Sequence, residues 1–332
     1  MPDTAVKSKP RKWWMTLIKV VVTLAICAAI IQHTRWSTFA ATLETTDIPL
    51  GIVVFLLLVL SVPISAYKWQ KLLAVHDLHY RTISLQRWYM TALFMNYFLP
   101  TSIGGDGYRI YKTWDNPKAG SCAVLAVFME RLTGLAALLL MGYVAAIIQC
   151  VRAGDAFSRL LVVVGAVGIA AGLLSLWMII QFRLARRLTA SKWCPGAIKT
   201  LLTFTVDYRT HPGPTTVAII VSFVFQAHTV LYHWVMLAAL GVHCDVAQLT
   251  VVLAAMTVIG LLPISLGGLG LVDGSFIYLI GLYGVGYDAA LSAMLLIRVM
   301  VLPLSLSGAG FYFTEPSTSR HDLRRAGSDG SA

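Results

Sequence analysis

The chain has 332 residues, of which 58% are hydrophobic and only 12% are charged. Soluble domains carry about 25% charged residues, so the composition excludes a soluble globular protein and predicts an all-α, polytopic membrane protein. The net charge is +11, but the basic residues gather in a few short segments between apolar runs. This clustering argues against a nucleic-acid partner and is typical of loops that stay in the cytoplasm.

Six apolar runs are long enough to cross a membrane, because each is near the ~20 residues that a spanning helix needs. They lie at about 13–31, 49–67, 121–148, 157–181, 213–240 and 288–313. Six full crossings place both termini on one side, and the basic segments indicate that this side is the cytoplasm. We therefore expect a transmembrane domain over 13–313, with short disordered cytoplasmic tails over 1–12 and 314–332.

Two further apolar segments are interrupted by nearly the same motif, LPTSIGGDG at 99–107 and LPISLGGLG at 262–270. Proline and paired glycine break a helix, and a broken helix at membrane depth is tolerated where it is buried in protein or lines a cavity. Each arm has roughly 15 residues, about 22 Å, which is short of the ~30 Å hydrocarbon core. The first segment has basic flanks, whereas the second leads to a loop without Lys or Arg. We expect two re-entrant helical hairpins of opposite orientation in an inverted repeat, although tilted crossings would give the same topology.

Three charged residues lie deep in the predicted spans. Glu130 and Arg131 lie about nine residues into one span and Arg298 about ten residues into another, which places all three near the membrane midplane. Charges at this depth are costly and usually functional. Because adjacent residues on a helix do not face each other, Glu130 and Arg131 should each pair with some other residue.

The partners that we expect lie beside the two breaks. The predicted gating and ion-pair residues are Asp106, Glu130 and Asp273. The predicted substrate-binding residues are Arg131, Arg298, Arg109, Gly104, Gly105, Gly267 and Gly268. Arginine suits an anionic headgroup because its guanidinium binds phosphate bidentately and stays charged when buried, and glycine lets the backbone approach a ligand closely. The alternatives are an ion-pair network that only fixes helix packing and turns that only permit close packing.

No sequence pattern indicates catalysis, a metal site or a cofactor. The five cysteines are scattered without CxxC spacing, and the two glycine motifs lack the strand and the Gly-Lys-Ser/Thr of nucleotide-binding loops. His228 and His233 lie in one predicted span with Gln226. We interpret them as packing histidines, with a proton relay as the alternative.

Three motifs and a late arginine carry a resemblance to a known family. The motifs are LPTSIGGDGYR at 99–109, ERLTGL at 130–135 and PISLGGLGLVD at 263–273, followed by Arg298. They resemble the lysylphosphatidylglycerol synthase transmembrane-region family, also called flippase-like domain proteins, over about residues 13–313. The resemblance implies a multi-pass protein of the bacterial or archaeal plasma membrane. One departure is that the family usually has Glu where this chain has Asp273.

The resemblance also implies lipid as the cargo. In the two-domain synthases, the transmembrane region is credited with moving aminoacylated phospholipid between leaflets, and a soluble aminoacyl-transferase domain follows it. This chain stops at Ala332, so the resemblance implies a stand-alone form that lacks the transferase domain and is not an enzyme.

The leading hypothesis is a translocator for an anionic or aminoacylated phospholipid or a lipid-linked precursor. Its site would lie between the hairpins, where Arg131 and Arg298 bind a phosphate or pyrophosphate headgroup. The alternatives are an intramembrane enzyme, an accessory subunit of a cell-envelope lipid pathway and a carrier of small solutes or ions. Besides the lipid, the partners that we consider are a second copy of the chain in a homodimer and envelope-biosynthesis enzymes.

Overall fold

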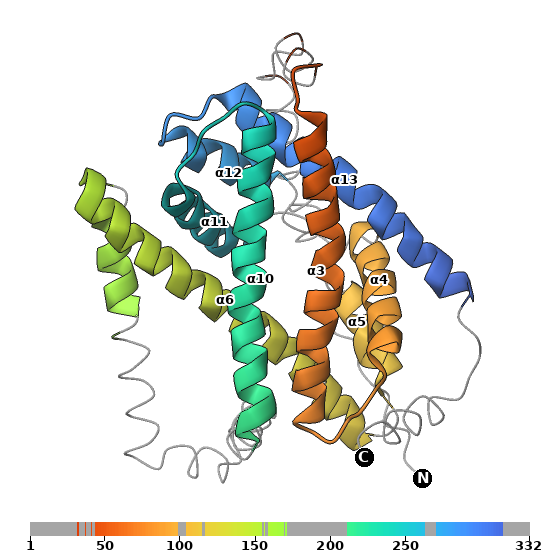
Figure 1. The fold of residues 1–332 in the computed structure, drawn as a ribbon. Coiled ribbons are helices and arrows are strands. Elements are labelled where there is room, and N and C mark those ends of the chain that lie inside the picture. Colours follow the sequence, from red (N-terminus) through yellow and green to blue (C-terminus); the bar gives the residue numbers. More distant parts are fainter. Residues whose placement is uncertain are drawn as a thin grey trace, which may run out of the picture.

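The computed structural model describes residues 44–98, 104–114, 117–154, 159–168, 211–262 and 270–314, together with the single residues 32, 37, 41, 156 and 170. Nearly all of these residues are helical, and none of them lies in a strand (Figure 1). The labelled helices are α3 (Ile48–Ala74), α4 (Thr82–Phe98), α5 (Gly104–Lys112), α6 (Pro117–Ala153), α10 (Pro212–Ala239), α11 (Val246–Gly260), α12 (Leu271–Gly281) and α13 (Tyr287–Thr314). The predicted all-α, polytopic class is confirmed.

Four of the six predicted spans are present as long apolar helices, α3, α6, α10 and α13. Helix α6 has 37 residues, about 55 Å at the helical rise, and extends beyond the predicted 121–148 at both ends. The predicted span 13–31 lies outside the described residues. Of the predicted span 157–181, a helix at Arg159–Gly168 is described. Both predicted tails also lie outside, apart from Thr314 at the end of α13.

The two predicted hairpins appear as two pairs of short helices. Helices α4 and α5 have 17 and 9 residues, and α11 and α12 have 15 and 11. Even α4 spans only about 26 Å, which is short of the ~30 Å core. Each pair packs together, and the turning residues 99–103 and 263–269 lie outside the described part of the chain. In Figure 1 the α4–α5 pair lies mostly in the lower half and the α11–α12 pair in the upper half, as expected for opposite orientations.

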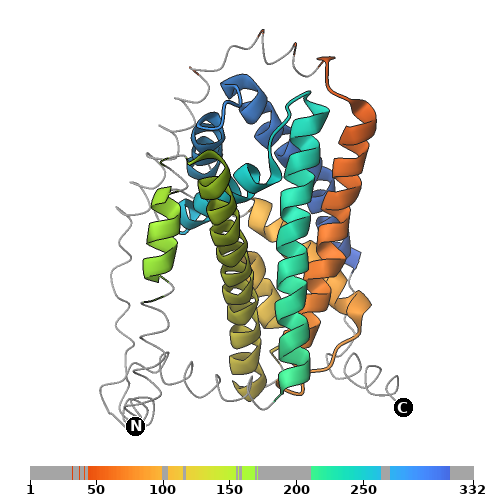
Figure 2. The ribbon, with the colours of Figure 1, turned by 60° about the vertical axis from the view of Figure 1, so that its left-hand side comes forward.

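Helices α3–α6 and α10–α13 form two repeats with the same order of long, short, short and long helix. Helix α3 begins at the top of Figure 1 and α10 begins at the bottom, and the two run antiparallel side by side (Figure 2). The first arm of each hairpin packs on the last helix of the other repeat, α4 against α13 and α11 against α6. The repeats are therefore inverted and interlocked.

A glycine lies at each of these two crossings. A Cβ atom on Gly308 of α13 would overlap the carbonyl oxygen of Met90 on α4, and a Cβ atom on Gly142 of α6 would overlap the Cβ of Ala254 on α11. The Thr91 hydroxyl donates to the Gly308 carbonyl at 3.3 Å. Gly142 follows Arg131 by eleven residues and Gly308 follows Arg298 by ten, so both repeats use small residues for close helix approach at equivalent places.

The apolar core also divides by repeat. One cluster joins α10, α11, α12 and α13 with the first half of α3, and includes Phe276 and Leu253. The other joins the second half of α3 to α4 and α6, and includes Trp69 and Leu85. The backbone N–H of Asp47, which caps α3, donates to the Ala239 carbonyl at the end of α10 at 2.8 Å. Each repeat therefore has most of an apolar core of its own, and the paired long helices α3 and α10 hold the two repeats together.

Candidate functional site

The first charged site is organised around Asp106 in the first turn of α5, where the helix dipole favours a negative charge. Its Oδ1 accepts from Arg109 Nη2 at 2.6 Å. Its Oδ2 accepts from Arg131 of α6, through Nε at 2.7 Å and Nη2 at 2.5 Å. Asp106 is 7% exposed, so this buried carboxylate is compensated by two arginines.

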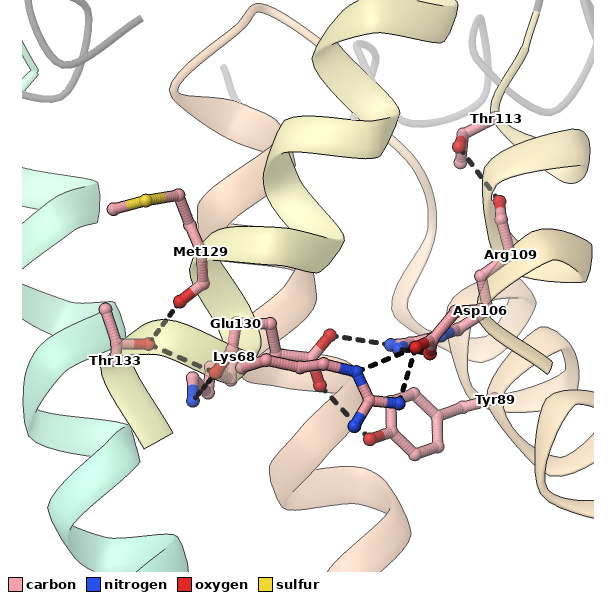
Figure 3. Close-up of polar contacts among 9 residues, drawn as sticks. Lys68, Tyr89, Asp106, Arg109, Thr113, Met129, Glu130 and Thr133 are labelled. Atoms are coloured by element: carbon pink, nitrogen blue, oxygen red, sulfur yellow. Dashed lines mark hydrogen bonds and ion pairs between the residues drawn. The ribbon is translucent and has the colours of Figure 1, made fainter. Parts of the chain in front are cut away.

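Arg109 is enclosed on every side. Its Nη1 donates to Glu130 Oε2 at 2.6 Å, and its guanidinium lies 5.1 Å from the ring centre of Trp69 and 4.6 Å from that of Tyr89. The side chain is only 4% exposed. Figure 3 shows Arg109 and Asp106 from α5 directed toward Glu130 on α6. Arg109 therefore joins two carboxylates and leaves little surface for a ligand.

Glu130 has three contacts within this site. Besides Arg109, its carboxylate accepts from the Tyr89 hydroxyl at 3.1 Å. Its backbone carbonyl accepts from Lys68 Nζ at 2.7 Å, and Lys68 is 4% exposed. As expected from helix geometry, Glu130 and Arg131 pair with α5 residues and not with each other.

The second charged site is simpler. Arg298 of α13 donates to Asp273 of α12 through Nε at 2.8 Å and through Nη2 at 2.7 Å, a bidentate pair. Asp273 also accepts from the Gly270 N–H at 3.1 Å. The Tyr97 hydroxyl at the end of α4 donates to the Arg298 carbonyl at 3.0 Å. The first hairpin thus reaches the second site.

The two sites are equivalent in the repeat. Arg131 follows Asp106 by 25 residues, and Arg298 follows Asp273 by 25 residues. Each Asp is the third residue of its helix, α5 or α12. The spacing from the Gly-Gly motif to the arginine differs between the repeats, because Gly105 precedes Arg131 by 26 residues and Gly268 precedes Arg298 by 30. The Asp–Arg pair, more than the glycine motif, is therefore the feature that repeats with constant spacing.

Gly105 of the first break serves helix packing in this structure. The Gly105 N–H donates to Asn96 Oδ1 at 2.9 Å, and a Cβ atom at Gly105 would overlap the Ala92 carbonyl oxygen on α4. Gly104 begins α5. Gly267 and Gly268, the corresponding predictions in the second break, lie outside the described residues.

Exposure and charge distinguish the arginines. The side chain of Arg131 is 60% exposed and that of Arg298 is 33% exposed, whereas Arg109 is buried. The first site contains three basic side chains, Lys68, Arg109 and Arg131, and two acidic ones, so its formal net charge is +1. The second site is a neutral pair. The first site therefore has an uncompensated positive charge and one accessible guanidinium.

Sequence reasoning did not identify Lys68, Tyr89 or Tyr97. Lys68 lies near the end of a span and resembles a basic residue of a cytoplasmic flank. The tyrosines look like ordinary aromatic residues of a membrane helix. Their contacts depend on how α3, α4, α6 and α13 pack, which no local sequence pattern reports.

The buried histidines contact backbone carbonyls. His228 Nε2 lies 2.8 Å from the Leu57 carbonyl oxygen, and His233 Nδ1 lies 2.8 Å from that of Thr229. Gln226 donates to the Gly134 carbonyl at 2.9 Å. These contacts favour the packing interpretation. Among the described residues, no group of three or more His, Cys, Asp or Glu side chains is arranged to hold a metal ion.

Comparison with known proteins supports one family. A comparison with curated proteins gave no match. The family model described as "Lysylphosphatidylglycerol synthase TM region" matches residues 16–308, which include both repeats and both Asp–Arg pairs. The chain therefore belongs to the lysylphosphatidylglycerol synthase transmembrane-region family.

Proposed function

We propose that this protein moves an anionic phospholipid, or an anionic lipid-linked precursor, between the leaflets of the plasma membrane. Family membership suggests a role connected with membrane lipids in the cell envelope. The observation that carries the finer proposal is the repeated Asp–Arg pair, once in each of two inverted halves and with identical spacing. Inverted repeats with binding groups at broken helices are the usual architecture of alternating access.

Arg131 is the group that we assign to the headgroup in the first half. A phosphate that binds its guanidinium replaces the contact with Asp106. Asp106 then keeps its hydrogen bond to Arg109, so no buried carboxylate is left without a partner. Exchange of Asp106 for a phosphate at Arg131 costs little free energy, because Arg109 stays in place through its contacts with Glu130, Trp69 and Tyr89. We therefore assign Arg109, Asp106 and Glu130 to positioning and exchange of ion pairs.

The charge of the first site indicates the class of substrate. A net charge of +1 inside the membrane is costly, and a phosphodiester would neutralise it. A zwitterionic headgroup supplies no net negative charge. The site therefore favours a lipid with one net negative charge.

Arg298 is the corresponding group of the second half. Its release is less well compensated than that of Arg131. When Arg298 leaves, Asp273 keeps only the Gly270 N–H as a contact in the described part of the chain. This pair should open only when a headgroup or a conformational change supplies a substitute. Tyr97, which contacts the Arg298 backbone from the first hairpin, offers a connection between the halves.

The basic end of the fold gives the proposed orientation. Lys71 lies at the end of α3, Arg81 lies just before α4, and Lys112 ends α5. By the positive-inside rule, this end faces the cytoplasm, and the α10–α11 loop faces the opposite side.

The test is translocation of a headgroup-labelled lipid in reconstituted vesicles. The probe is NBD-labelled phosphatidylethanolamine, which carries one negative charge, in phosphatidylcholine vesicles. External dithionite destroys the fluorescence of the outer leaflet alone unless lipid crosses. We expect fluorescence to fall well below half with wild-type protein and to stay near half with Arg131→Gln or Arg298→Gln.

Arg152→Gln is the matched control, because Arg152 also lies on α6 but is 65% exposed at its far end, 3.6 Å from Asp245. It should behave as wild type. If wild-type vesicles match protein-free vesicles, the proposed translocation is wrong. If Arg131→Gln and Arg298→Gln both match wild type, the assignment of these residues is wrong.

A further inference from the structure

A separate cavity of about 170 Å³ lies between α4 and α13, lined by Arg87, Trp88, Thr91, Phe311 and Thr314. It is distinct from the two ion-pair sites. Along the same interface, Thr91 contacts Gly308 and Tyr97 contacts Arg298. Arg87 and Tyr97 are ten residues apart on α4, about 15 Å at the helical rise.

Arg87 differs from the arginines of the two ion-pair sites. Arg109, Arg131 and Arg298 each bind a carboxylate at 2.8 Å or less. Arg87 is exposed, and within the described residues its guanidinium makes no hydrogen bond or ion pair with any acceptor. A guanidinium on an otherwise apolar helix interface favours an anion from outside the chain.

The other walls indicate which anion fits. The rings of Trp88 and Phe311 form apolar walls. The hydroxyls of Thr91 and Thr314 already donate to the backbone carbonyls of Gly308 and Gly310, so Arg87 is the side chain of this lining that supplies donors for a phosphate. The volume accommodates a phosphate and part of a glycerol but not acyl chains, which would remain against the exposed apolar faces of the helices. A fully hydrated free anion gains little from apolar walls, whereas a phospholipid keeps its chains in hydrocarbon.

We propose that this cavity binds the phosphate of an anionic phospholipid from the leaflet at the basic end of the fold. Arg87 supplies the charge, and Trp88 and Phe311 enclose the glycerol. Arg87 lies near the start of α4, six residues after Arg81, which belongs to the basic end of the fold. The site goes beyond the proposed translocation, because its occupant need not be transported.

Native mass spectrometry of the full chain tests the site by counting retained lipids. The probes are phosphatidylglycerol, phosphatidylcholine and inorganic phosphate, each added to detergent-purified protein. We expect Arg87→Gln to retain one phosphatidylglycerol fewer than wild type. Thr314→Trp, which adds bulk to the cavity lining without changing charge, should lose the same molecule. Arg81→Gln, an equal change of charge six residues away, should retain as many as wild type.

The proposal is overturned if Arg87→Gln retains as many phosphatidylglycerol molecules as wild type, or if Arg81→Gln loses as many as Arg87→Gln. Retention of phosphatidylcholine or inorganic phosphate in equal number would also overturn the assignment to an anionic lipid. The Arg87→Gln, Arg131→Gln double variant separates this site from the translocation site. If translocation is wrong and Arg131 binds no lipid, Arg87→Gln still loses one molecule and the double variant loses no more.

Discussion

Two arginines share the carboxylate of Asp106, and their surroundings differ sharply. Arg109 lies between two buried carboxylates and two aromatic rings. Arg131 contacts one oxygen of Asp106 and is 60% exposed. Removal of Arg109 leaves both Asp106 and Glu130 short of a buried cation, whereas removal of Arg131 leaves Asp106 its bond to Arg109. The same carboxylate therefore has one arginine for structure and one that is available for exchange.

We predict that Arg109→Gln destabilises the protein by about 3–5 kcal/mol, because it leaves both Asp106 and Glu130 short of their buried cation. Arg131→Gln should cost less, because Asp106 keeps its hydrogen bond to Arg109. Thermal unfolding of the purified variants in detergent measures the difference. Equal losses of stability would contradict the division of roles.

Lys68 supplies the excess positive charge of the first site. Lys68→Gln keeps a donor for the Glu130 carbonyl and removes one charge, so the net charge of the site falls to zero. We predict that this variant loses the preference for anionic over zwitterionic labelled lipid. Transport of the two lipids in the same vesicle assay measures that preference, and Lys71→Gln, three residues along α3, is the control. An unchanged preference in Lys68→Gln would contradict the argument from charge.

The sequence predicts part of this site and misses part of it. Their depth in an apolar run identifies Glu130, Arg131 and Arg298, because charged residues at that depth are costly and usually functional. Helical spacing predicts that Glu130 and Arg131 have separate partners. The partners from α3 and α4, Lys68 and Tyr89, depend on packing between distant segments.

At the scale of helices, the two crossings hold the repeats together. Helix α4 meets α13 at Gly308, and α11 meets α6 at Gly142. Without a hydrophobic driving force between helices in lipid, close backbone approach at small residues supplies much of the attraction. The crossing of α4 and α13 also carries Tyr97 to Arg298, so its geometry affects the second site.

We predict that Gly308→Ala destabilises the α4–α13 crossing, because the new Cβ overlaps a backbone oxygen that cannot move cheaply. Gly310→Ala is the matched control, since a Cβ there meets nothing within 4 Å. By helix propensity alone, both changes should stabilise by up to about 1 kcal/mol. Thermal unfolding should show a lower Tm for Gly308→Ala and an equal or higher Tm for Gly310→Ala. A rise in both would show that the crossing is looser than the structure indicates.

The two hairpins can be predicted from the sequence, but the packing of each first arm on the last helix of the other repeat cannot. Proline with paired glycine predicts each break, and the arm length predicts that neither arm crosses the membrane. That α4 packs on α13 and α11 on α6 depends on surfaces more than 150 residues apart in the first case. The apolar faces of these helices are similar in composition, so the composition of one face does not predict which helix packs against it.

At the scale of the whole molecule, inversion makes equivalent loops lie at opposite ends. The α3–α4 loop contains His79 and the α10–α11 loop contains His243, and both residues are exposed. They stand at corresponding places of the two repeats, because each lies a few residues before a first hairpin arm. An inverted protein with its basic end in the cytoplasm should therefore present the two loops to different compartments.

We predict that His243→Cys reacts with a membrane-impermeant maleimide in intact cells, while His79→Cys reacts only after the membrane is permeabilised. Labelling is measured as the increase over the wild-type signal, because the wild-type protein shows the background from the native cysteines. The neighbouring Cys244 should add little at neutral pH, because burial, with Asp245 close by, raises the pKa of its thiol to about 11 and keeps it protonated. Labelling of both positions from one side would contradict the inversion. Labelling of His79→Cys alone in intact cells would keep the inversion but reverse the proposed orientation, so that the cavity at Arg87 would face the outer leaflet.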